Sequence, residues 1–78
     1  MPTLESTVNK AMKELKLDSV SPNQQKMLRD AMEEYGEEAS SGDDRRKKEA
    51  DKRLKDAAII CGTKHDTVKN ALAKLGIK

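Results

Sequence analysis

The stretch RLKDAAIICGTKHDTVKNALAKLGIK, residues 53–78, decides the predicted fold. Its pattern indicates a helix, a turn of three to four residues opened by Gly62, and a second helix. Apolar side chains recur on one side of the second helix. The other side carries polar side chains, namely Lys64, His65, Lys69 and Asn70. Two short helices joined in this way must bury their apolar sides against the rest of the chain.

The composition of the 78 residues limits the fold to one small helical domain. Tyr35 is the only aromatic residue, and the large apolar side chains are Leu, Ile, Val and Met. No segment shows the period-two alternation of a half-buried strand. We therefore predict an all-α domain of four helices, 1–78, in which the last two helices form a helix-turn-helix.

Two further helices are predicted before residue 43. The first begins near Thr3 or Leu4, and a stripe of helical period is formed by Leu4, Val8, Ala11, Met12 and Leu15. Residues 17–20 break that pattern and are predicted to form a short loop. For the second helix, Ser21 is a natural N-cap, Pro22 fits the first helical position and Gln24 suits a capping box. Gly36 is a plausible end, although residues 37–39 can extend the helix by one turn.

The small polar stretch 39–43 is predicted to connect the two pairs of helices. The third helix begins at Asp43 or Asp44 and runs to about Cys61, with an apolar side made of Ala50, Leu54, Ala57, Ala58 and Cys61. Opposite charges lie at i,i+4 in three pairs: Arg45 with Glu49, Lys47 with Asp51, and Lys52 with Asp56. The fourth helix begins near His65 or Asp66 and ends at Leu75. Gly76 and Ile77 are predicted to close it in a Schellman motif.

Charge is distributed unevenly along the sequence. Residues 1–43 hold five basic and nine acidic side chains, a net charge of −4, whereas residues 44–78 hold 11 basic and five acidic ones, a net charge of +6. The domain is thus divided into an acidic helical pair, 1–42, and a basic half, 43–78. A basic segment favours an acidic partner, usually nucleic acid, although a solvated helix of mixed charge is the alternative.

Several classes of function are disfavoured by what the sequence lacks. Cys61 is the only cysteine and cannot form an internal disulfide, and His65 has no companions at a metal-ligand spacing. No nucleophile, base and orienting group are found in one pattern, so we expect neither an enzyme nor a bound cofactor. No long apolar run or signal peptide is present, so we expect a cytoplasmic protein with no membrane partner.

Residues 54–73 resemble the helix-turn-helix of phage repressors, Cro-like proteins and related bacterial regulators. Ala58 stands at the small position in the first helix of that motif, Gly62 at the glycine of the turn, and Val68 at the branched position that packs the two helices together. Two features depart from the pattern. Thr63 stands where an apolar residue is usual, and Ile59 and Ile60 stand where polar residues are usual. The two isoleucines suggest that another surface, either the first two helices or a second subunit, covers the third helix.

The resemblance implies a small DNA-binding protein that regulates transcription or another DNA transaction, with helix 65–75 in the major groove. Its groove-reading positions fall on Lys64, His65, Asp66, Lys69, Asn70 and Ala73. Asn70 suits an adenine edge and Lys69 suits guanine, whereas Asp66 is expected to cap the helix. The expected phosphate contacts are Arg45, Arg46, Lys47, Lys48, Lys52 and Lys74. The expected partner is double-stranded DNA. Because one such unit makes few base contacts, a homodimer is expected if binding is sequence-specific.

Other functions remain open for the same residues. The lysines of the last helix are also typical of the solvent-exposed side of an amphipathic helix, where they would have no binding role. The acidic N-terminal half, with Ile59 and Ile60, suits a module that docks on a larger nucleic-acid enzyme. RNA binding or non-specific duplex binding through residues 45–55 is a third possibility, although the sequence lacks the aromatic residues on which single-stranded or RNA binders stack bases.

Overall fold

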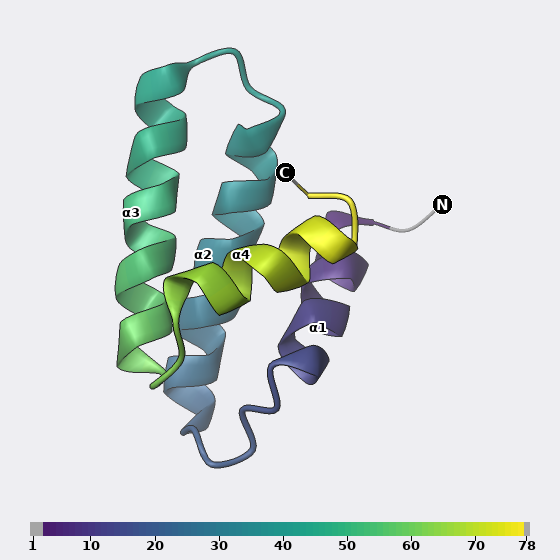
Figure 1. Cartoon of the computed structure of the whole chain (residues 1–78), viewed down its shortest axis with the longest axis vertical. Coiled ribbons are helices and arrows are strands. Elements are labelled where there is room, and N and C mark those ends of the chain that lie inside the picture. Colours follow the sequence, from purple (N-terminus) through teal and green to yellow (C-terminus); the bar gives the residue numbers. More distant parts are fainter. Residues whose placement is uncertain (1–2, 78) are drawn as a thin grey trace.

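Four α-helices make up the architecture of the chain, which is seen in a computed structural model that describes residues 3–77 (Figure 1). They are α1 (Leu4–Glu14), α2 (Pro22–Ala39), α3 (Asp44–Ile60) and α4 (His65–Lys74). No strand occurs among the described residues. The predicted all-α fold of four helices is confirmed.

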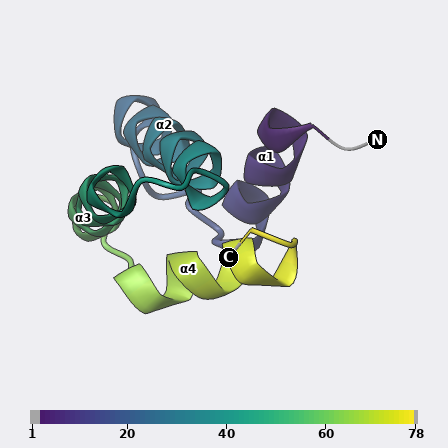
Figure 2. The same ribbon diagram turned by 90° about the horizontal axis from the view of Figure 1, so that it is seen from above.

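The helices form a ring around one core. The long helices α2 and α3 run antiparallel, side by side, and α4 crosses in front of them toward α1 (Figure 1). Seen from above, α2 packs against α1 and α3, and α4 closes the ring by packing against the same two helices (Figure 2). This arrangement leaves the outer side of α4 uncovered by any other helix.

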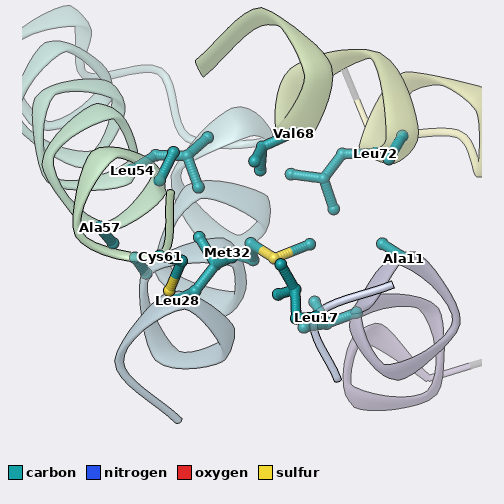
Figure 3. Close-up of a cluster of buried hydrophobic side chains, with 13 residues drawn as sticks. Ala11, Leu17, Leu28, Met32, Leu54, Ala57, Cys61, Val68 and Leu72 are labelled. Carbon is teal, nitrogen blue, oxygen red and sulfur yellow. The ribbon is translucent and has the colours of Figure 1, made fainter. Parts of the chain in front are cut away.

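The core is made of aliphatic side chains that every helix contributes. The largest fully buried ones are Val8, Leu28, Met32, Leu54, Val68 and Leu72. Met32 of α2 and Leu72 of α4 approach each other across the ring (Figure 3). Burial of one such side chain contributes roughly 1.5–3 kcal/mol, so this cluster holds the crossing helices together.

Helix α2 begins at the predicted N-cap but ends later than Gly36. Ser21 caps it, its hydroxyl oxygen accepting the Gln24 N–H at 3.3 Å. The helix continues through Gly36 to Ala39, so the stop predicted at Gly36 is wrong and the extension by one turn is confirmed. Gly36 has a packing role instead, because a Cβ there would lie 2.5 Å from Cδ1 of Leu4.

Both glycine-terminated helices end in Schellman motifs; the sequence predicts this motif at Gly76 and a turn at Gly62. Gly62 has a φ of +75°, and the Thr63 N–H bonds to the Ala58 carbonyl at 2.9 Å. Gly76 has a φ of +95°, and the Ile77 N–H bonds to the Leu72 carbonyl at 3.0 Å. The first motif sets the direction in which the chain leaves α3 and thereby the crossing of α4.

The thiol of Cys61 belongs to the structural core. Its Sγ donates to the Gln24 carbonyl at 3.2 Å, and desolvation by burial raises the pKa of the thiol above its ordinary value. A raised pKa reduces the thiolate fraction at neutral pH, so this cysteine is a poor nucleophile.

Two predictions about the turn region need correction. Lys64 occupies the N-cap of α4 without a side-chain cap hydrogen bond, and Asp66 lies inside the first turn. The expected cap by Asp66 is therefore wrong, because the helix begins one residue before it, at His65. The first two helices also fail to cover the isoleucine pair, since Ile59 is 60% exposed and Ile60 is 45% exposed. In the described part of the chain, no helix has the length and apolar character needed to cross a membrane.

Candidate nucleic-acid interface

The outer side of α4 is the surface on which most of the predicted groove-reading residues lie. Val68, Ala71 and Leu72 fill the core, so helical period turns the residues between them outward. The exposed positions on this helix and its N-cap are Lys64, Asp66, Thr67, Asn70, Ala73 and Lys74. The outer side therefore offers an amide, a carboxylate and two ammonium groups along one helix, a mixture of donors and acceptors suited to base edges.

Two predicted readers, His65 and Lys69, are engaged within the protein instead. His65 Nε2 lies 3.0 Å from Oδ1 of Asp51, and Lys69 Nζ lies 3.3 Å from the same oxygen. The Lys69 ammonium also lies 5.9 Å from the centroid of the Tyr35 ring. His65 and Lys69 thus point along the flank of α4 that faces α3, while Asn70 and Ala73 are exposed.

This cluster ties α4 to α3 with polar contacts at the edge of the core. The partners are not fully exposed, with side-chain exposures of 21% for His65, 40% for Lys69 and 39% for Asp51. Because solvent screens such pairs, each contributes about 0–1 kcal/mol to stability. The expected pairing of Asp51 with Lys47 is replaced by these contacts, which depend on the crossing of α3 and α4 and have no local signal in the sequence.

Replacing Asp51 with asparagine should strengthen binding of the chain to duplex DNA about threefold to fivefold at low salt. The substitution removes one negative charge and frees Lys69 and His65, and a partly exposed ion pair is worth about 1 kcal/mol at most. Fluorescence anisotropy with a labelled duplex measures the change. Asp56→Asn is the matched control. This substitution removes the same charge, but from the flank of α3 that faces α2. An equal gain from both variants would show a general charge effect and contradict a role for the cluster.

The basic residues of α3 divide between two flanks of the helix. Arg45, Arg46, Lys48 and Lys52 are exposed and Lys47 is half-buried. By helical period, Lys48 and Lys52 form one stripe with Lys55 on the flank of Asp51 and α4, whereas Arg46 lies toward α2. Lys55 was not among the predicted phosphate contacts. It is exposed and extends the stripe toward α4. Three lysines on the α4 side are therefore the best placed for phosphate contacts.

The charge separation along the sequence is partly cancelled in space. The acidic C-terminal part of α2 lies beside the basic N-terminal part of α3 because the two helices are antiparallel (Figure 1). Glu34 and Arg53 form an ion pair across this contact. The pairing of Arg53 with Glu34 removes one cation from the α2 side of α3, whereas Lys48, Lys52 and Lys55 on the α4 side remain exposed.

A shallow depression of about 510 Å³ lies between the end of α1 and α4. It is lined by Glu14, Leu15, Lys16, Thr67, Asn70, Ala71 and Lys74. Lys16 and Thr67 were not predicted as site residues. The loop after α1 carries Lys16 with a φ of +50° and brings it to α4, a long-range placement that no local pattern in the sequence reveals.

No group of three or more His, Cys, Asp or Glu side chains within residues 3–77 is arranged to hold a metal ion. Comparisons of the chain with protein-family models, with curated proteins and with solved structures find no match.

Proposed function

We propose that this chain is a small DNA-binding protein whose helix α4 enters the major groove, as part of a transcriptional or other DNA-transaction regulator. The observation that carries the proposal is the position of α4, which has one side in the core and the other free of any covering helix (Figure 2). A major groove about 12 Å wide accepts a helix presented in this way.

The chemistry of the outer side supports base reading. Asn70 can accept from and donate to an adenine edge, and Asp66 can accept from the amino group of cytosine. Ala73 is small and apolar, which suits contact with a thymine methyl group. Lys64 lies at the N-cap of α4, where the positive end of the helix dipole adds to its attraction for a phosphate.

Phosphate contacts would come from the elements on either side of α4. Lys48, Lys52 and Lys55 are exposed on α3, and Lys16 and Lys74 line the depression beside α1. These lysines would fix the position of the protein on the duplex without reading its sequence. One such unit makes few base contacts, so a specific site would be bound by two copies.

A salt titration tests the proposal. The logarithm of the association constant for a random-sequence duplex should fall linearly with the logarithm of salt concentration, with a slope of about −0.9 per phosphate contact. Lys48→Gln with Lys52→Gln should reduce the magnitude of the slope by about 2. Lys10→Gln with Lys26→Gln is the control, since it removes the same charge from exposed sites on α1 and α2. No binding at low salt, or equal slopes for both double variants, would overturn the proposal.

A further inference from the structure

A groove with an apolar floor lies between α2 and α3, on the flank of α3 opposite to Asp51 and α4. Its volume is about 350 Å³, and it is lined by Met27, Asp30, Ala31, Glu34, Arg53, Asp56, Ala57 and Ile60. Ala31 of α2 and Ala57 of α3 both line the hollow, and each carries only a methyl group as its side chain. Met27 is 50% exposed and Ile60 is 45% exposed, so two large apolar side chains stand in solvent beside it.

The charge of the groove is negative. Glu34 is neutralised by its ion pair with Arg53 at one end. Asp30 and Asp56 remain, and neither forms an ion pair with another of the residues that the structure describes. An apolar floor between two free carboxylates is complementary to an apolar side chain that is flanked by cations.

We propose that this groove binds one amphipathic helix of another protein, which inserts large apolar side chains over Ala31 and Ala57 and places lysine or arginine residues beside Asp30 and Asp56. A helix laid in a groove between two helices is a recurrent mode of peptide recognition, with anchors spaced three or four residues apart. Met27 and Ile60 would cover the sides of the inserted anchors.

A second copy of the chain fits this groove less well. A face-to-face pairing of two grooves would bring Asp30 and Asp56 of one copy toward the same acidic residues of the other. The exposed basic stripe of α3 carries one large apolar residue, Ile59, so another copy would offer one large anchor from this stripe and not two.

The groove is tested by selecting binders from a displayed library of helical peptides with randomised apolar and charged positions, using the purified full chain as the target. The selected peptides should carry two large apolar residues three or four positions apart, with lysine or arginine beside them. Fluorescence polarisation should show that Ile60→Lys lowers the affinity of the chain for the tightest-binding selected peptide at least tenfold. Ile59→Lys is the matched control and should leave binding unchanged, because Ile59 is exposed but does not line the groove.

Charge exchange gives a second test that loss of folding cannot imitate. Asp30→Lys with Asp56→Lys should abolish binding of the selected peptide and should create binding of a peptide in which glutamate replaces its basic residues. Selection of acidic peptides, or of none, would overturn the proposal, as would equal loss from Ile59→Lys and Ile60→Lys. Sedimentation of the free chain as a dimer that Ile60→Lys dissociates would also overturn it and would assign the groove to a second copy.

Discussion

Asn70→Ala should weaken binding to a specific DNA site about 10-fold to 100-fold while leaving binding to random duplex nearly unchanged. A bidentate amide contact with adenine is worth roughly 1–3 kcal/mol of discrimination, and Asn70 is the exposed amide at the centre of the outer side of α4. The specific site is first obtained by selecting bound oligonucleotides from a random pool. Anisotropy with that site and with a random duplex then measures the two affinities.

Two variants make this result interpretable. Asn9→Ala removes an exposed amide from α1 and should change neither affinity. Lys69→Ala should cost less specific affinity than Asn70→Ala, because the Lys69 ammonium is already paired with Asp51. If Asn70→Ala keeps its specific affinity and its helical circular dichroism, α4 does not read bases through this residue.

Leu72→Ala should lower the free energy of unfolding by about 3 kcal/mol, in the range of 2–5 kcal/mol observed for leucine truncation in cores. Leu72 is fully buried and meets Met32 across the ring, so its loss leaves a cavity where α4 closes the fold (Figure 3). A domain of this size has a total stability of roughly 4–12 kcal/mol, so this loss would remove between about a quarter and three quarters of it.

Urea denaturation followed by circular dichroism measures this loss. Leu75→Ala, at a half-buried position one turn later, is the control and should cost clearly less. A loss below about 1 kcal/mol for Leu72→Ala would mean that α4 is not held by the core as the structure shows.

The helices and the turn were predictable because their signals are local. Apolar residues at helical period mark the buried sides, Ser21 with Pro22 marks the start of α2, and Gly62 and Gly76 mark two Schellman ends. Each of these features depends on residues within one helix or at its ends. Gly36 misled the prediction because its role lies in packing against Leu4, which is distant in the sequence.

The candidate site was less predictable because its geometry depends on how helices cross. Helical period identified Asn70 and Lys74 as outward residues of α4. The same period could not reveal that Asp51 pairs with His65 and Lys69. These partners lie 14 and 18 positions from Asp51 and are brought to it by the α3–α4 crossing. Lys16 and the groove beside Ile60 have the same origin, since each is formed by segments that only the folded chain brings together.

The most direct test of the central proposal is an NMR titration of the isotope-labelled chain with duplex DNA. The measured quantities are the shifts of the backbone amide resonances of the chain. DNA binding through α4 predicts that the largest shifts occur at Lys64, Asp66, Asn70, Ala73 and Lys74, with smaller ones along Lys48, Lys52 and Lys55. Residues of the α2–α3 groove, such as Met27 and Ala31, should not move. The absence of any shift at low salt, or shifts that avoid α4, would contradict the proposal.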